Sequence, residues 1–468
     1  MSTFSDWVKN SYTVKFAIVG FLMLILLIPT SMIEGLISER QERSNQVNAE
    51  VGSKWGNTQT LTGPIINVPY KTKFKSTNAN GETIYTDGTG TLHFLPEQLN
   101  ISNNTKTEIR KRGIYNAVVY SNEATFSGHF SGFDESKLNI EKDAVLWEQA
   151  YISLPISDLR GIKNKVIVTL NNQQTEMNPG IKDNDILIHS YNQQYNLSRY
   201  KDMVETVPVP SQSGNSGASS GLSAPITIKD VQKTEFSFTL LINGSSALSF
   251  IPTGKETNVS VTSPYTTPSF DGAFLPDTRS ISDKGFKADW KVLNLNRNFP
   301  QEWTNNAYDI NNASFGVNLL VPIDHYQKTM RSAKYAIMFI LLTFLVFVFA
   351  EILNGYKIHP VQYLLIGLAL VVFYTLLLSL SEQIGFTKSY LVSSAAIILL
   401  ITIYAKSIFR ENKLMAVLAG ILLILYGFLF IILRSEDYAL LIGSIGLFIV
   451  LTVVMYLSRM VKWYREDT

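Results

Sequence analysis

Six uncharged, mostly apolar windows constrain this chain more than any other feature of its sequence. They cover residues 16–33, 335–350, 361–381, 389–405, 414–433 and 438–458. Each is close to the ~20 residues that cross a bilayer as a helix. Helices are expected because lipid cannot satisfy the backbone polar groups of an open strand or loop. The pattern predicts a membrane protein with one N-terminal and five C-terminal transmembrane helices.

A long polar region separates the first window from the other five. It mixes aromatic and β-branched residues with polar ones in alternation, as in IYNAVVYSNEATFSGHF, TEFSFTLLING and TNVSVTSPYTT. Such alternation is typical of half-buried strands, and turn signals such as NANGET and TDGTG lie between them. We therefore expect an α + β membrane protein whose large extracytoplasmic domain is β-rich and sandwich-like.

One stretch inside this domain, SQSGNSGASSGLSAP at residues 211–225, is rich in Ser and Gly. Its composition predicts a flexible loop. The loop would divide the domain into lobes of about residues 45–206 and 228–327. The alternative is one continuous sheet system that carries a disordered insertion.

Composition and charge argue against several classes of protein. Hydrophobic residues make up 46% of the chain and charged residues 17%, a balance that favours a membrane protein. The net charge is only +2, and there is no basic stripe of the kind that nucleic-acid binding needs. The chain has no cysteine, which excludes disulfides and Cys-based metal or nucleophile sites. The expected partner is the lipid bilayer, and no nucleic acid.

The orientation follows from lysines and arginines in short loops, which concentrate on the cytoplasmic side. With the N-terminus inside, the outside loops hold only Lys388 and Arg434. The cytoplasmic segments then hold Lys9, Lys15, Lys357, Lys406, Arg410, Lys413, Arg459, Lys462 and Arg465. Five charges oppose this orientation, namely Arg40, Arg43, Lys328, Arg331 and Lys334, but long domains cross membranes largely regardless of such charges.

This orientation predicts a complete domain plan. Residues 1–15 and 459–468 would be cytoplasmic, so both termini would lie inside the cell. Residues 16–37 would form an uncleaved transmembrane signal anchor. Residues 38–330 would form the extracytoplasmic β-rich domain, and residues 331–458 a five-helix transmembrane bundle.

Motifs that carry catalysis or bind metals are hard to find. Residues 217–221 match G-x-S-x-G, but that elbow must join a strand to a helix, and here it lies in the Ser/Gly stretch. The five histidines are scattered without the i, i+4 spacing of a helical metal site; they are His93, His129, His189, His325 and His359. We predict no enzymatic activity, no cofactor and no metal.

Glu382 is the polar residue that most needs an explanation. It follows the uncharged window 361–381 and has Ser379 and Ser381 beside it. At ~1.5 Å per residue it lies about 30 Å beyond the start of the span, at the outer interface. A carboxylate there is either an interfacial cap or a functional group that couples the β-rich domain to the bundle. Candidate partners for coupling are Arg331, Lys334 and Lys388, which approach the same membrane surface.

Several stretches together resemble the CreD family of bacterial inner-membrane proteins. They include RKRGIYNAVVY (110–120), ISDLRGIKN (156–164), FTLLINGSSALSFIPTGKETNVSV (238–261), TPSFDGAFLP (267–276), LNRNFPQ (295–301), FGVNLLVPIDHYQKTMRSAKYAIMFI (315–340) and VQYLLIGLALVVFYTLLLSLSEQIGF (361–386). The resemblance implies an inner-membrane location, one N-terminal span, a large periplasmic domain and a C-terminal helical bundle. It also implies a role in cell envelope integrity and envelope stress, without a biochemical activity for any residue.

Three functions remain open. The first is a non-enzymatic envelope protein whose β-rich domain binds a periplasmic protein or envelope component. The second is a transporter or lipid-handling protein, which requires Glu382, Ser379, Ser381 and Tyr374 to converge on a polar cavity. The third, a hydrolase, requires a Ser or a carboxylate pair in a deep cleft.

Overall fold

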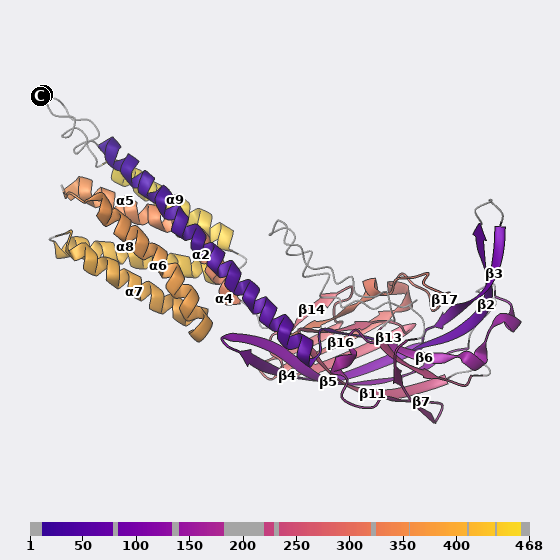
Figure 1. Ribbon diagram of the computed structural model, residues 1–468. Coiled ribbons are helices and arrows are strands. Elements are labelled where there is room, and N and C mark those ends of the chain that lie inside the picture. Colours follow the sequence, from indigo (N-terminus) through magenta and orange to yellow (C-terminus); the bar gives the residue numbers. More distant parts are fainter. Residues whose placement is uncertain are drawn as a thin grey trace, which may run out of the picture. The chain divides into compact units, whose positions relative to one another are not determined.

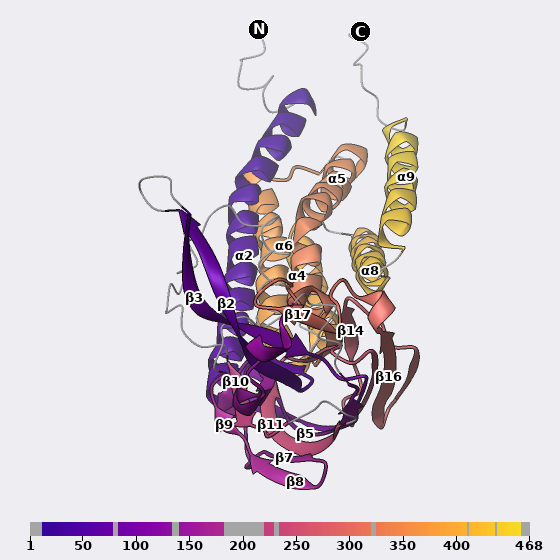
Figure 2. The same ribbon diagram turned by 90° about the vertical axis from the view of Figure 1, so that its right-hand side faces the viewer.

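The computed structural model describes most of the 468 residues. The residues described are 12–77, 83–132, 140–181, 220–228, 234–319, 324–354, 356–409, 411–435 and 438–459. The chain divides into two compact units (Figures 1 and 2). One contains residues 1–45 and 323–468 and is helical, and the other contains residues 46–322 and is strand-rich.

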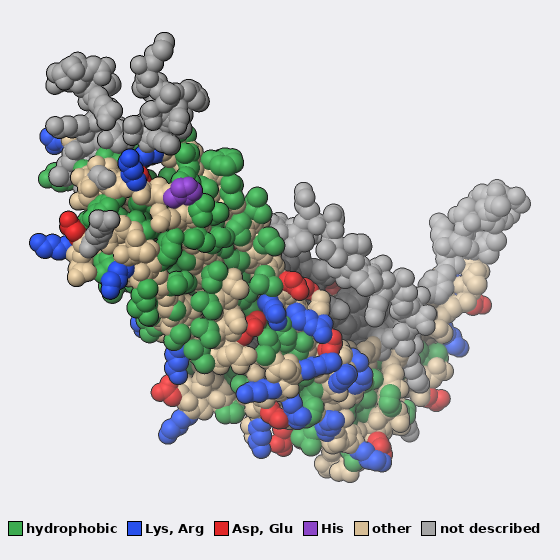
Figure 3. Space-filling model, turned by 60° about the vertical axis from the view of Figure 1, so that its left-hand side comes forward, with side chains coloured by type: hydrophobic (Ala, Val, Ile, Leu, Met, Phe, Trp, Pro, Cys, Tyr) green, Lys and Arg blue, Asp and Glu red, His purple; other side chains and the backbone are tan. Residues whose placement is uncertain are grey.

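The helical unit is built from apolar helices. Its elements are α2 (Tyr12–Trp55, which ends in the strand-rich unit), α4 (Asp324–Lys334), α5 (Ala336–Asn354), α6 (Pro360–Ile384), α7 (Phe386–Lys406), α8 (Asn412–Arg434) and α9 (Ala439–Ser458). Among the described residues, α2, α5, α6, α7 and α8 are long and apolar enough to cross a membrane, and α9 is apolar over Leu441–Tyr456. Hydrophobic side chains cover the visible face of these helices in Figure 3. The predicted architecture of a strand-rich domain with one N-terminal and several C-terminal apolar helices is confirmed, with four or five of the five predicted C-terminal helices meeting the length and composition of a span.

Local chemistry fixes where the helices begin and end. Pro360 is the first residue of α6, where its missing N–H is not needed, and the His359 side chain accepts a hydrogen bond from the Val361 N–H. Gly385 ends α6 with φ at +79°, a conformation that favours glycine. Gly367 lets α2 and α6 approach closely, because a Cβ there would collide with Leu26.

Two helices differ from the sequence prediction. The signal anchor expected at 16–37 is the first half of a 44-residue helix, α2, which continues to Trp55. The second is α4, a polar, amphipathic helix with the sequence DHYQKTMRSAK, most of which falls within the predicted β-rich domain 38–330. The unit boundary falls at Pro322 and Ile323, so α4 belongs to the helical unit and the predicted boundary at 330 is eight residues late.

The strand-rich unit contains eighteen described strands in three sheets. The four-stranded sheet has the order β1 (Gln59–Thr62), β12 (Ala247–Ile251), β18 (Phe315–Asn318), β14 (Ser269–Gly272). The six-stranded sheet runs β17 (Glu302–Thr304), β3 (Thr83–Phe94), β2 (Ile65–Thr77), β6 (Tyr151–Pro155), β10 (Gly221–Pro225), β9 (Asn178–Pro179). The eight-stranded sheet runs β15 (Thr278–Ser282), β16 (Gly285–Leu293), β13 (Glu256–Ser263), β4 (Gln98–Arg112), β5 (Tyr115–Phe130), β11 (Thr234–Ser245), β7 (Ile167–Leu170), β8 (Gln173–Glu176).

Each sheet mixes strands from both sides of the Ser/Gly stretch, so the predicted lobes 45–206 and 228–327 are not separate. The loop prediction for 211–225 is wrong at its end, because residues 221–225 form β10 between β6 and β9. This short strand was hidden because GLSAP has the composition of a linker, and its pairing partners are distant in sequence. The remainder of the stretch, up to residue 219, lies outside the described residues.

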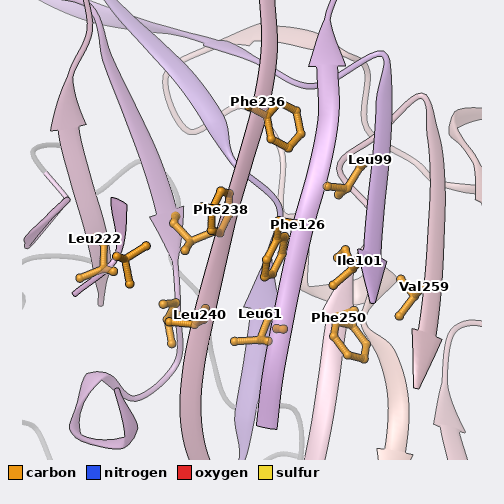
Figure 4. Close-up of a cluster of buried hydrophobic side chains, with 14 of the residues drawn as sticks. Leu61, Leu99, Ile101, Phe126, Leu222, Phe236, Phe238, Leu240, Phe250 and Val259 are labelled. Atoms are coloured by element: carbon orange, nitrogen blue, oxygen red, sulfur yellow. The ribbon is translucent and has the colours of Figure 1, made fainter. Parts of the chain in front are cut away.

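The three sheets share one hydrophobic core. Strands of the eight-stranded sheet alternate buried and exposed side chains, as the sequence predicted for β11 and β13. Their buried residues pack with those of the other sheets, among them Leu61, Leu222 and Phe250 (Figure 4). Phe126 and Phe238 stack with ring centroids 4.6 Å apart. The exposed residues of the same strands form a polar outer face.

Candidate functional site

Glu382, in the last turn of α6, is held by a residue that the sequence prediction did not name. The Tyr326 hydroxyl of α4 donates a hydrogen bond to Glu382 Oε1 at 2.8 Å. Glu382 is half-buried and Tyr326 is 1% exposed. The helix dipole disfavours a negative charge in the last turn of a helix. The Glu382 carboxylate therefore needs another group to stabilise it at the end of α6. The contact with α4 supplies a stabilising partner.

The helix α4 presents one polar but buried face to the bundle. Tyr326, Thr329 and Ser332 recur every three residues and are each 0–1% exposed. The Thr329 hydroxyl donates to the His325 carbonyl at 2.6 Å, so this hydroxyl is satisfied inside its own helix. The opposite face carries Lys334, which is exposed. The sequence places α4 directly after β18, so the chain leaving the strand-rich unit enters the bundle through this helix.

The other predicted members of the Glu382 site do not gather around it. Ser379 is exposed, and the buried Ser381 hydroxyl donates to the Leu378 carbonyl of its own helix at 2.8 Å. Arg331 is half-buried, whereas Lys334 and Lys388 are exposed. Within the described residues, none of these three bases forms an ion pair with Glu382. The structure brings Glu382 together with a hydroxyl of α4 in place of a base, and a coupling role stays a prediction.

A second carboxylate, Glu351 of α5, lies at the opposite end of the bundle. Glu351 is 5% exposed. The Lys15 ammonium of α2 forms an ion pair with Glu351 Oε1 at 2.8 Å. The Tyr363 hydroxyl donates to Oε2 at 3.0 Å, and the Ile358 N–H donates to Oε1 at 3.3 Å. Lys15 and Glu351 are 336 positions apart, so no local sequence pattern signals the pair. We refer to the two ends of the bundle as the Glu351 end and the Glu382 end.

Tyr374, a fourth residue required for a polar cavity, is packed into an aromatic core. It is 2% exposed and its ring meets Phe373 edge-on at 4.9 Å. Phe373 in turn contacts Tyr390 and Tyr426, and the Tyr390 hydroxyl donates to the Tyr426 carbonyl at 2.7 Å. Tyr374, Ser379, Ser381 and Glu382 therefore do not converge on a polar cavity in the described structure.

A buried polar chain in the six-stranded sheet contains residue types used in hydrolysis. The Asn67 amide donates to Ser153 Oγ at 2.8 Å, and Asn67 Oδ1 lies 2.7 Å from His93 Nδ1. All three residues are 0–1% exposed. Because the serine is buried and bonded through an amide that separates it from the histidine, it is not placed to attack a substrate. Among the described residues, no group of three His, Asp or Glu is arranged to hold a metal ion.

The polar face of the eight-stranded sheet contains a shallow groove of about 380 Å³. The pairing of adjacent strands places the short side chains that line this groove side by side, in rows that cross the sheet. One row is Thr278, Asp289, Ser260, Ser102 and Thr125, and Asn100, Ser127, Asn258, Asp277 and Lys291 lie alongside. Because most of these side chains are short, the face is hollowed and rich in hydroxyls and amides.

Comparison with known proteins identifies the family. The family model described as "Inner membrane protein CreD" matches residues 11–464. The chain is also 30% identical over 448 residues to the protein named "Inner membrane protein CreD" of Escherichia coli (strain K12), covering 94% of this chain and 91% of that one. The chain belongs to the CreD family. It is thus an inner membrane protein with several membrane-spanning helices, and the family description names no enzymatic activity.

Three of the CreD-like stretches meet where α2 ends. Trp55, in the last turn of α2, donates its indole N–H to the Tyr120 carbonyl at 3.1 Å, and Arg110 lies over its ring at 4.4 Å. Gly56 follows with φ at +136°, and a Cβ there would collide with the Asn243 carbonyl. Residues from 110–120, 156–164 and 238–261 thereby hold the end of α2 in the strand-rich unit. The sequence could not show this, because the stretches are distant from one another.

Asp158 is the charged centre of this CreD-family junction. It is 8% exposed, and it accepts hydrogen bonds from Arg160 Nε at 2.9 Å, from the second guanidinium nitrogen at 2.7 Å and from the Asn57 N–H at 3.1 Å. Burial alone would raise the pKa of Asp158, but these hydrogen bonds and the Arg160 charge outweigh burial and hold the pKa below its usual value. The charged form of Asp158 is therefore the one that stabilises the fold.

Proposed function

We propose that this CreD-family protein is a non-enzymatic component of cell envelope maintenance. Its strand-rich unit binds an envelope component or a periplasmic protein, and its bundle anchors that unit in the inner membrane. Contact between α4 and α6 carries the state of the strand-rich unit to the bundle.

The orientation is part of this proposal. The lysines and arginines of the short loops favour an orientation with both termini in the cytoplasm and residues 38–330 in the periplasm. Reporter fusions at Ser216 and at Thr468 test it. We expect a periplasmic signal from the first and a cytoplasmic signal from the second, and a cytoplasmic signal at Ser216 would contradict the whole proposal.

The observation that carries the proposal is the Tyr326–Glu382 hydrogen bond. Glu382 sits on α6, and Tyr326 on the helix that joins β18 to the bundle. Because Glu382 is half-buried and partly screened by solvent, we expect this hydrogen bond to contribute about 1 kcal/mol, the usual net value for one intramolecular hydrogen bond. A contact of this size is strong enough to bias α4 and weak enough to be broken by a bound partner.

Variants at the two ends of this bond test the coupling. Tyr326→Phe and Glu382→Gln should each weaken tolerance to envelope-directed agents at normal protein levels, and the double variant should be no worse than the single ones. Tyr335→Phe is the matched control, because its hydroxyl has no partner among the described residues. Wild-type tolerance in both single variants would leave Glu382 as an interfacial cap only.

The polar groove supports the binding part of the proposal. Its hydroxyl, amide and carboxylate side chains suit a ligand rich in hydroxyl groups, such as an envelope glycan, or a polar protein surface. A photo-crosslinker at Ser102, which is exposed in the groove, should capture this partner in intact envelopes. The same crosslinker at Gln174, on the opposite edge of the sheet, should not.

A second candidate function is lipid handling, and a different observation favours it. An apolar groove of about 440 Å³ lies between α5, α8 and α9. It suits the hydrocarbon part of a lipid, although it does not contain the polar residues that a transporter of ions or protons needs.

A further inference from the structure

The groove between α5, α8 and α9 is nearly free of polar groups. Its lining includes Phe347, Leu353, Val417, Ile421 and Val453. The polar exception among the lining residues is Asn354, whose amide donates to the Ala350 carbonyl at 3.0 Å within its own helix. All the other lining side chains are apolar, so the groove suits hydrocarbon.

One close approach of α8 and α9 lies outside the groove. Gly446 of α9 faces the Phe428 ring so closely that a Cβ there would collide with it. Toward the Glu351 end, side chains of α8 and α9 instead line the groove together with those of α5. It extends along α5 from Leu342 to Asn354, about 18 Å at ~1.5 Å per residue. That length matches one leaflet of a ~30 Å hydrocarbon core.

Positive charge surrounds the end at which the groove reaches the interface. Lys413 immediately precedes the lining residue Leu414, and Arg459 follows the lining residue Val454 by five positions. Lys357 and Lys406 also lie at the Glu351 end, and all four side chains are exposed. Glu411 is the exposed acidic residue among them. This excess of basic groups beside a groove between transmembrane helices is the arrangement that holds anionic lipid headgroups.

We propose that the groove binds one acyl chain of an anionic phospholipid, whose phosphate is held at the Glu351 end by Lys413. The occupant is a bilayer lipid, because the groove is apolar and one leaflet deep. It is anionic, because the groove ends among basic residues. With the orientation proposed above, the site lies in the cytoplasmic leaflet, but the proposal does not depend on the role of Glu382 or on what the strand-rich unit binds.

Native mass spectrometry of the full-length protein tests this site. The delipidated protein is titrated with phosphatidylglycerol or with phosphatidylcholine of identical acyl chains. We expect phosphatidylglycerol to be retained in preference. Lys413→Gln should weaken its binding about fivefold, which corresponds to the roughly 1 kcal/mol of one basic residue near an anionic surface. Arg434→Gln removes a charge from the other end of α8 and should leave binding unchanged.

Filling the groove gives a second, independent readout. Val417→Trp on α8 and Val453→Trp on α9 should each reduce retention of both lipids, whereas Leu423→Trp should not, because Leu423 is exposed on α8 outside the groove. Two groove variants are used so that, if one of them misfolds, the other still tests the groove.

Three outcomes would overturn the proposal. Equal retention of the two lipids by the wild-type protein would remove the headgroup site. Wild-type retention in both tryptophan variants of the groove would place any bound lipid elsewhere. A dimer that is lost in both of these variants would show that a second copy of the chain covers the groove.

Discussion

The two ends of the bundle carry one carboxylate each, and the two are held in different ways. Glu351 is almost fully buried and has three partners, one of them the Lys15 ammonium. Glu382 is half-buried and is held by the Tyr326 hydroxyl. Removing one partner of a buried ion pair is costly, whereas one hydrogen bond at an interface contributes little to stability. The Glu351 end is therefore suited to a fixed clamp, and the Glu382 end to a contact that can change.

The largest effect should come from breaking the clamp. Glu351→Ala leaves the Lys15 ammonium without its partner and removes the acceptor of Tyr363 and Ile358. We expect the free energy of unfolding to fall by about 3 kcal/mol, at the lower end for buried pairs, because Lys15 is 27% exposed. Thermal unfolding of the detergent-solubilised protein measures it. Adding Lys15→Met should recover part of the loss, and no recovery would argue against the ion pair as the cause.

A smaller effect is expected at Asp158, which allows the same comparison outside the membrane. Its pKa is below the usual value in the folded protein, so its stabilising contribution is complete above about pH 4 and is lost as pH falls through the folded pKa. Asp158→Asn should lower the free energy of unfolding of the strand-rich unit at pH 7 by about 1–2 kcal/mol, since the Arg160 side chain is largely exposed.

Repeating the Asp158→Asn measurement near pH 3 provides the control. The difference between the wild-type protein and the variant should be smaller there, because the stabilisation by the charge is lost as the pH falls below the unfolded pKa and through the lower folded pKa. A difference that does not depend on pH would show that the Asp158 charge is not what holds the junction.

At the Glu382 end we expect about 1 kcal/mol. Tyr326→Phe and Glu382→Gln, combined in a double-mutant cycle, should give a coupling energy of this size in thermal or chemical unfolding. A coupling energy near 3 kcal/mol would make the Glu382 end a second clamp and remove the contrast between the two ends. A value near zero would show that the hydrogen bond contributes nothing.

The smallest effect should come from the bases that the sequence suggested as partners of Glu382. Arg331→Gln, Lys334→Gln and Lys388→Gln should each change the free energy of unfolding by less than about 0.5 kcal/mol, as is usual for exposed or half-buried charges without a described ion pair to Glu382. A larger loss that disappears in the Glu382→Gln background would restore that base as a partner.

The elements that could be predicted from the sequence are those whose residues follow a local pattern. The apolar windows predicted the helices, and alternation predicted strands such as β11 and β13, because the period of two in a strand is set by the backbone. It did not predict α4, because the buried face of that helix is made of Tyr, Thr and Ser rather than of apolar residues. Nor did it predict β10, because a short strand in a linker-like sequence is decided by its neighbours in the sheet.

At the candidate site, the sequence identified the residue but not its partner. Glu382 stood out against an uncharged window, whereas Tyr326 is 56 positions away in a polar stretch. Charge complementarity pointed to Arg331, Lys334 and Lys388, but the helical register of α4 turns Tyr326 inward and leaves Lys334 exposed. Contacts of this kind depend on packing that single-sequence patterns do not contain.

Amide hydrogen exchange across α4 tests the central claim most directly. It is measured on the full-length protein in lipid nanodiscs, with the wild type compared against Glu382→Ala. Loss of about 1 kcal/mol of local stability predicts about fivefold faster exchange over residues 324–334, with unchanged exchange around Glu351. Unchanged exchange in α4, or an equal increase at both ends of the bundle, would contradict the claim that Glu382 specifically holds α4.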